Sequence, residues 1–82
     1  MKLKFYTDVG HGWLAVKRQV VDTLAIEVSH YSYQRGNTVY LEEDCDAPKL
    51  LNELKNRGLA YSITEKYSDR SPIRSYESYR KV

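Results

Sequence analysis

Cysteine is almost absent from this 82-residue chain, because Cys45 is the only one. A lone thiol cannot form a disulfide within the chain, and it cannot supply a cysteine-ligated metal cage unless two chains share it. We therefore expect neither an internal disulfide nor a metal site. A reducing compartment is consistent with this cysteine usage.

Long hydrophobic runs and a signal peptide are also missing. No stretch approaches the roughly 18 apolar residues that a transmembrane helix needs. The N-terminal segment MKLKFYTDVG is charged and strand-like, and it lacks an apolar core followed by a small-residue cleavage site. The sequence thus predicts a cytoplasmic protein that has no membrane partner.

A strong charge of one sign is absent as well. The formal net charge is +2, and residues 1–67 carry nine basic and nine acidic side chains, so the excess lies entirely in residues 68–82. Domains that bind duplex nucleic acid usually show a much larger basic excess. The charge balance therefore leaves nucleic acid open as a partner without requiring it.

What is present is an ordinary globular composition, with 41% hydrophobic and 29% charged residues. A domain of this length buries only about 60% of the surface that its unfolded chain exposes, so the core is expected to be small. The patterns predict a compact α+β domain over residues 1–67 and an irregular, basic Arg/Tyr/Ser tail over residues 68–82. The tail either packs on the domain, through Ile73, Tyr76 and Tyr79, or extends from it.

The N-terminal third predicts a strand followed by a helix. Residues 2–8 alternate between apolar and polar side chains, as in a half-buried strand, and Gly10-His11-Gly12 then interrupts it as a loop. From Trp13 the apolar residues recur at spacings of three and four, which predicts a helix over residues 14–25. An alternative in which residues 13–16 form a short strand stays open, because valines are mediocre helix formers.

The middle of the chain predicts a hairpin. Residues 26–34 and 37–43 are rich in β-branched and aromatic side chains, and Arg35-Gly36-Asn37 between them is typical of a turn. If Gly36-Asn37 forms a two-residue turn, Tyr33 faces Tyr40 across the ladder and Tyr31 lies on the same face. A shift of the turn by one residue would break this aromatic cluster.

The following segment predicts a second helix and a last strand. Asp44 and Asp46 before Ala47-Pro48 indicate the start of a helix, and Gly58 can end it in the left-handed conformation. The helix has one apolar stripe, made of Ala47, Leu50, Leu51 and Leu54. Residues 59–67 alternate again, and their inner face is expected to consist of Leu59, Tyr61 and Ile63.

The predicted order is strand, helix, strand, strand, helix, strand, which is the βαββαβ arrangement of the ferredoxin-like fold. Right-handed crossovers would give a four-stranded antiparallel sheet with both helices on one face. The other face would be free for a partner or for a second copy, so a homodimer is compatible with this fold. The fold alone does not indicate a function, since many unrelated proteins share it.

Candidate catalytic residues are few. His11 lies in a flexible glycine loop beside Trp13 and could act as a general base, but no serine or cysteine nucleophile accompanies it at a diagnostic spacing. The acidic run Glu42–Asp46 could bind a hard cation, although its spacing does not match a calcium loop and helix capping explains half of it. We expect no enzymatic activity and no cofactor. A hydrolase or nuclease built on His11 and the acidic run is the least favoured alternative.

Residues 35–42 can be compared with the third strand of the RNA-recognition motif, which has a basic-Gly-aromatic signature. Asn37, Val39 and Glu42 stand where that motif has aromatic residues, so most of the stacking surface is missing. Tyrosine, tryptophan and arginine are nonetheless the residue types that dominate interfaces. On this basis the expected partner-binding residues are His11, Trp13, Tyr31, Tyr33, Arg35, Tyr40, Arg70, Arg74, Tyr76 and Tyr79.

Three blocks of the sequence carry a resemblance: residues 10–14 (GHGWL), residues 31–46 (YSYQRGNTVYLEEDCD) and residues 70–76 (RSPIRSY). The chain resembles a family of small uncharacterised proteins encoded by bacteriophages, prophages and plasmids. Ala25 departs from that pattern, because such relatives are expected to have glycine at the end of the first helix.

The resemblance implies a small protein made by a mobile element inside a bacterial cell. We therefore expect a non-enzymatic binding protein that engages a bacterial host protein and inhibits a defence system, in the manner of an anti-CRISPR protein. The alternative is a nucleic-acid-binding module or small regulator that uses the basic Tyr/Arg tail and the sheet tyrosines.

Overall fold

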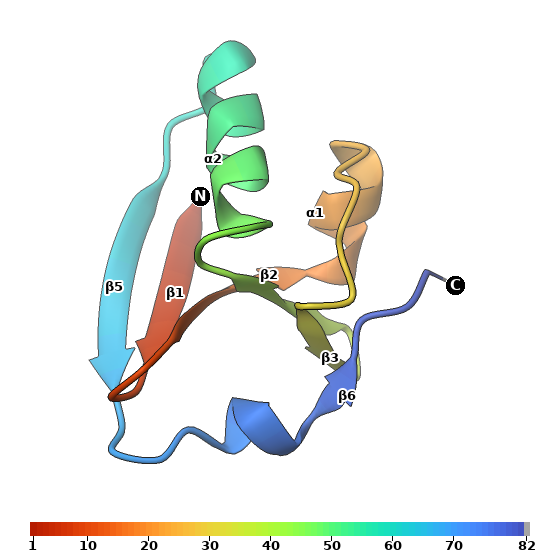
Figure 1. Ribbon diagram of the computed structural model, residues 1–82. Helices are drawn as coiled ribbons and strands as arrows, with labels where there is room; N and C mark the ends of the chain where they lie inside the picture. Colours follow the sequence, from red (N-terminus) through yellow and green to blue (C-terminus); the bar gives the residue numbers. More distant parts are fainter. Residues whose placement is uncertain (82) are drawn as a thin grey trace.

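Six strands form one mixed sheet, and two helices lie on one of its faces (Figure 1). The computed structural model describes residues 1–81. The strand order is β5-β1-β2-β4-β3-β6, in which β1 and β5 are parallel and the other neighbours are antiparallel. In chain order the elements are β1 (Lys2–Thr7), β2 (Gly12–Lys17), α1 (Arg18–Thr23), β3 (Tyr33–Arg35), β4 (Thr38–Glu42), α2 (Ala47–Asn56), β5 (Ser62–Tyr67), the 3-10 turn η1 (Pro72–Ser75) and β6 (Glu77–Ser78).

The α+β class and the two helices on one face are confirmed, but the ferredoxin-like order is not. Residues 12–17, most of which were assigned to a helix, form strand β2, which pairs with both β1 and β4. The helix expected over residues 14–25 is limited to Arg18–Thr23. A strand that is covered on both faces reads as a continuous apolar run, and Trp13, Leu14 and Val16 are all buried. The strand left open as an alternative is thus the correct interpretation.

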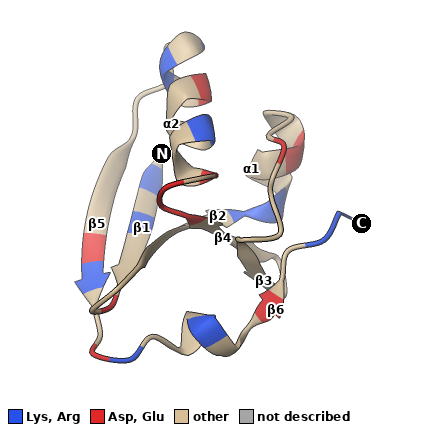
Figure 2. Cartoon of the chain, in the orientation of Figure 1, with Lys and Arg blue, Asp and Glu red and all other residues tan. Residues whose placement is uncertain are grey.

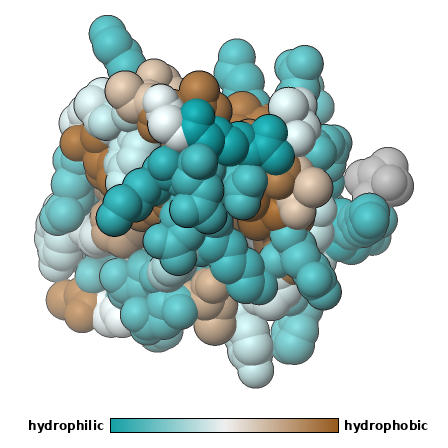
Figure 3. Space-filling model, turned by 90° about the horizontal axis from the view of Figure 1, so that it is seen from above, coloured by the Kyte–Doolittle hydropathy of each residue, from teal (hydrophilic) through white to brown (hydrophobic). Residues whose placement is uncertain are grey.

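The core lies between the helices and the sheet. Leu50 and Leu54 of α2 are fully buried, as are Leu14 of β2 and Leu41 of β4. Their spacing on α2 agrees with the predicted apolar stripe of that helix, which is confirmed at Ala47–Asn56. Seen from above, hydrophilic side chains cover much of the surface, and hydrophobic side chains show between them (Figure 3).

The β3-β4 hairpin has the predicted turn. Arg35 pairs with Thr38, so Gly36 and Asn37 form a two-residue connection, and Gly36 has a φ of 58°. Tyr33 consequently faces Tyr40, as predicted. The expectation for Tyr31 is wrong, because β3 begins only at Tyr33, and Tyr31 lies outside the sheet, 59% exposed.

Both helices end in the same hydrogen-bonded motif. In α1 the amides of Ala25 and Ile26 donate to the carbonyls of Asp22 and Val21, and in α2 Gly58 and Leu59 donate in the same pattern. This is the Schellman arrangement, which requires a left-handed residue directly after the helix cap. Gly58 fills that position in α2 with a φ of 68°, whereas Ala25 fills it in α1 with a φ of 53°.

Asp46 precedes α2 as expected, but its side chain does not cap the helix. The fully buried carboxylate instead accepts hydrogen bonds from the Ser29 amide (3.0 Å), the Ser29 hydroxyl (2.7 Å) and the Ser32 hydroxyl (2.5 Å). The Ser32 hydroxyl also accepts a bond from the amide of Glu42. Asp46 therefore ties the loop between α1 and β3 to the start of α2.

The last predicted strand is present, but its inner face is not buried. β5 covers Ser62–Tyr67 at the edge of the sheet, and it pairs with β1 only. Leu59, Tyr61 and Ile63 are 45%, 39% and 44% exposed, respectively. Ile63 pairs with Leu3 and lies on the helix side as expected, but it stays half-exposed at the edge of the sheet. Leu59 and Tyr61 precede β5, so the expectation that they belong to its inner face is wrong.

The segment after β5 runs below the sheet, on the side opposite the helices (Figure 1). Ile73 of η1 is buried to 2% exposure, and β6 then pairs with β3. Val82, the last residue of the predicted tail, lies outside the described residues. Within residues 1–81, none of the helices is long and apolar enough to span a bilayer.

Candidate binding surface

The sheet face opposite the helices, here called the open face, is assembled from five strands. Side chains alternate between the two faces along each strand. Lys4 pairs with Ala15 and Thr64, and Ala15 pairs with Tyr40, so these positions share one face while Leu3, Leu14 and Val39 occupy the other. The cationic and aromatic residues of the open face are Lys2, Lys4, Tyr6, Trp13, Lys17, Tyr33, Arg35, Tyr40 and Lys66.

The charges of the open face are nearly all positive. Its five cations have no ion-pair partner within 4.0 Å among residues 1–81. Glu42 is the acidic side chain at these register positions, and its carboxylate accepts hydrogen bonds from the amides of Asp44 and Cys45. Figure 2 shows basic residues on β1, an acidic residue beside a basic one on β5, and acidic residues in the loop that leads into α2. Because side chains alternate between the faces of a strand, the open face carries Lys66 and not Glu65.

Tyrosines form a row across the centre of the open face. The ring of Tyr40 lies 6.2 Å from that of Tyr6 and 5.2 Å from that of Tyr76, measured between centroids. Arg35 stacks over Tyr76 at 5.0 Å and donates to its hydroxyl at 3.2 Å. Burial and the neighbouring tyrosines raise the pKa of Tyr40, so its hydroxyl stays protonated at neutral pH. The row offers ring surface together with hydrogen-bond donors.

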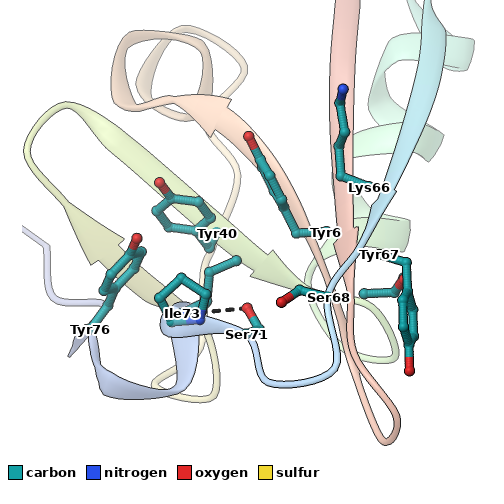
Figure 4. A pocket seen from close by; sticks show the side chains of 10 residues that line it. Tyr6, Tyr40, Lys66, Tyr67, Ser68, Ser71, Ile73 and Tyr76 are labelled. Carbon is teal, nitrogen blue, oxygen red and sulfur yellow. Dashed lines mark hydrogen bonds between the residues drawn. The ribbon is translucent and has the colours of Figure 1, made fainter.

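Two hollows flank this row. One, of about 430 Å³, lies among Lys2, Lys4 and Lys17, and the other, of about 280 Å³, lies beside Lys66 and the C-terminal segment (Figure 4). Tyr6 and Tyr40 line both hollows. The two hollows therefore adjoin, and cations lie on either side of an aromatic centre.

The C-terminal segment is anchored to the body by an ion pair. Arg74 donates from Nε (2.5 Å) and Nη2 (2.9 Å) to the two carboxylate oxygens of Asp8, whose side chain is 1% exposed. The amides of Gly10 and His11 also donate to Asp8, each at 3.0 Å. The hydrogen bond from Arg74 holds the pKa of Asp8 well below its usual value, although burial opposes this. Arg74 thus has a structural contact that the sequence did not predict.

Five of the predicted partner-binding residues gather at a third hollow, of about 310 Å³. His11 stacks on Trp13 at 6.0 Å between centroids, and its Nδ1 lies 3.0 Å from Arg74. Trp13 is only 2% exposed, so it serves the packing of the molecule. The predicted residues that line this hollow are His11, Trp13, Tyr31, Tyr33 and Arg74.

This third hollow does not contain a recognisable catalytic arrangement. Cys45 is exposed and also lines it, but no hydrogen bond joins the thiol to His11 in the described structure. No group of three or more His, Cys, Asp or Glu side chains within residues 1–81 is arranged to hold a metal ion. The acidic run around Glu42 is used for hydrogen bonds to the backbone of its own loop.

Three further predicted residues, Arg35, Tyr40 and Tyr76, meet in the tyrosine row, and the remaining two are dispersed. Tyr79 packs against the core and under the guanidinium of Arg18, at 5.4 Å from its ring centroid. Arg70 is exposed in the connection before η1. The prediction missed the lysines of β1, β2 and β5, although the alternation of residues 2–6 had indicated that Lys2, Lys4 and Tyr6 share a face.

Comparison of this chain with family models, with curated proteins and with solved structures finds no match. The resemblance to proteins of mobile elements therefore stays a prediction, and the site has to be interpreted from its own chemistry.

Proposed function

We propose that this chain is a non-enzymatic binding protein and that the open face binds single-stranded nucleic acid. The observation that carries the proposal is the set of five cations without ion-pair partners around a row of tyrosines. Proteins that bind single strands combine a positive groove for the backbone with aromatic rings on which bases stack. The open face has both components on one surface.

The distribution of charge favours a flexible strand over a duplex. The net charge of +2 is small, so the overall field is weak and attraction depends on the local group of lysines. A single strand can follow the adjoining hollows and present unstacked bases to Tyr6 and Tyr40. A duplex hides its bases from such a surface.

Fluorescence anisotropy with a labelled oligothymidylate of roughly 12 nucleotides tests the proposal, because single-strand sites span about 4–16 nucleotides. The double variant Lys4→Gln/Lys17→Gln should weaken binding and reduce the slope of log affinity against log salt by about 1.4, at about 0.7 per lost phosphate contact. A matched control, Lys55→Gln/Lys81→Gln, removes the same charge from outside the open face and should leave the slope unchanged. Absence of binding at about 50 mM salt, or equal losses in both double variants, would contradict the proposal.

A bacterial host protein is the second candidate partner. The observation that favours it is a series of exposed apolar side chains in and before β5, here called the β5 patch, since exposed apolar surface marks protein contacts; its members are Leu59, Tyr61 and Ile63. The resemblance to proteins of mobile elements supports this candidate, with inhibition of a host defence system as the expected outcome.

Affinity capture from bacterial lysate, run with and without nuclease, separates the two candidates. A stoichiometric protein that survives nuclease treatment and is lost with Ile63→Lys would establish the β5 patch as its docking site. Capture that depends on nucleic acid and ignores Ile63→Lys would favour the open face.

A further inference from the structure

The hollow of about 280 Å³ on the open face has one wall built from the C-terminal segment, whereas the hollow of about 430 Å³ has none. Figure 4 shows Tyr6, Tyr40 and Tyr76 in a row, with Ser71 and Ile73 of the C-terminal segment beside them. The Ser71 hydroxyl accepts a bond from the Ile73 amide at 3.2 Å, which fixes the start of η1. This hollow is bounded by β1 and β4 on the sheet side and by η1 on the other.

The size and walls of this hollow suit one planar ring. Pockets for drug-sized ligands span about 300–1,000 Å³, so 280 Å³ is enough only for a smaller group. Four tyrosines contribute to its lining, and aromatic rings stack on bases of any sequence. A single base is therefore a better occupant than a peptide side chain of irregular shape.

The polar groups of the lining also suit a nucleotide. Lys66 lines the hollow on β5 and has no ion-pair partner among the described residues, so it is available to a phosphate.

We infer that this hollow is a subsite for one unstacked nucleotide of a single strand, with the base among Tyr6, Tyr40 and Tyr76 and its phosphate near Lys66. The inference rests on the proposed function and adds where a base is recognised. The ion pair of Asp8 with Arg74 holds the wall in place before the ligand arrives, so little ordering is needed on binding.

The test compares an oligothymidylate with an abasic oligonucleotide of the same length, which keeps the phosphates and lacks the bases. The native protein should bind the oligothymidylate at least about 10-fold more tightly. Tyr76→Ala should reduce this ratio to about 3-fold or less. Tyr31→Ala, an exposed tyrosine that lines the third hollow and neither of the two beside the tyrosine row, should preserve it.

The outcomes separate the two proposals. Failure of both oligonucleotides to bind would contradict the proposed function, whereas equally tight binding of both would leave that function intact and overturn the subsite. A titration of the unaltered protein with thymidine 5′-monophosphate, followed by amide NMR shifts, needs no variant. Shifts at residues 66–76 are expected, and shifts confined to the hollow around Lys2 and Lys17, or no shifts, would also overturn the subsite.

Discussion

The two faces of the sheet come from the same strands but have opposite chemistry. One face is buried against the helices and consists of apolar side chains such as Leu3, Leu14 and Leu41. The side chains next to these along each strand, Lys4, Ala15 and Tyr40, lie on the other face. This second set is partly or fully exposed beside a short C-terminal segment. In so small a domain, the helix-covered face must supply most of the stability, which leaves the open face able to carry charge and aromatic surface.

The largest test of this comparison is a truncation on the helix-covered face. Leu41 of β4 is fully buried, so Leu41→Ala should lower the free energy of unfolding by about 2–5 kcal/mol through lost burial and a cavity. Thr38→Ala, on the same strand but on the open face, should cost less than about 1 kcal/mol. Urea denaturation followed by circular dichroism measures both, and similar losses would mean that the two faces contribute alike.

Removal of the buried Asp46 carboxylate, at the start of α2, should give the next largest loss of stability. Asp46→Ala leaves the Ser29 amide and the Ser29 and Ser32 hydroxyls without their acceptor, which should cost about 2–3 kcal/mol. Asp44→Ala, two residues earlier and exposed, should change stability by less than about 0.5 kcal/mol. Thermal and urea unfolding check the pair. Equal effects would show that Asp46 acts only as a surface charge.

Lowering the pH should reduce the stability of the fold through Asp8 on one side of the sheet and Asp46 on the other, by less than the two substitutions above. The hydrogen bond from Arg74 lowers the pKa of Asp8. Burial raises the pKa of Asp46, but the hydrogen bonds from Ser32, Ser29 and Lys49 outweigh the effect of burial, so the pKa of Asp46 is lowered overall. A carboxyl group whose pKa is lower in the folded chain stabilises the fold at pH values above its unfolded pKa of about 3.9. This stabilisation is lost as the pH falls below that value.

The Asp8→Asn variant isolates the contribution from the open side of the sheet. It should be less stable than the native chain at neutral pH and should lose less stability between about pH 5 and pH 3. Unfolding in urea at several pH values gives the comparison. Parallel curves for the two proteins would rule out Asp8 as a source of acid sensitivity.

The smallest expected effect has the opposite sign and concerns the helix ends. Ala25 adopts a φ of 53°, a left-handed conformation that costs roughly 1–2 kcal/mol for residues with a side chain. Ala25→Gly should therefore stabilise the chain by up to about 1 kcal/mol, after the greater freedom of glycine in the unfolded state is subtracted. The matched change Gly58→Ala in α2 should destabilise it by a similar amount. A loss of stability in Ala25→Gly would contradict this account.

Local signals in the sequence predicted local structure well. The Gly36-Asn37 turn specified the register of Tyr33 and Tyr40, and the proline and apolar stripe specified α2. Both depend on residues within a few positions of one another. At the end of α1, Ala25 takes the left-handed conformation that glycine usually supplies, so no glycine was there to signal this helix end.

What the sequence did not reveal depends on pairing across long separations. Apolar residues occupy both faces of β2, because Trp13 on the open face lies under Arg74 while Leu14 and Val16 face the helices, so the alternation was hidden and the run was interpreted as helix. The parallel pairing of β1 with β5 places Lys66 beside Tyr6, and no local pattern specifies it. The same limit concealed the contact between Asp8 and Arg74, and therefore the expected site combined the tail with the sheet tyrosines but left out the lysines of the strands.

The β1-β5 pairing also sets the order in which the chain can finish folding. Residues 2–7 and 62–67 lie side by side, and the amide of Ser62 donates to the carbonyl of Met1. During synthesis the β1-β2 hairpin can form early, while one edge of β1 has no neighbour until β5 has emerged from the ribosome. An unpaired strand edge is a template for pairing with other chains. β1 therefore keeps an edge open to misassembly from the time the β1-β2 hairpin forms until residues 62–67 have been made.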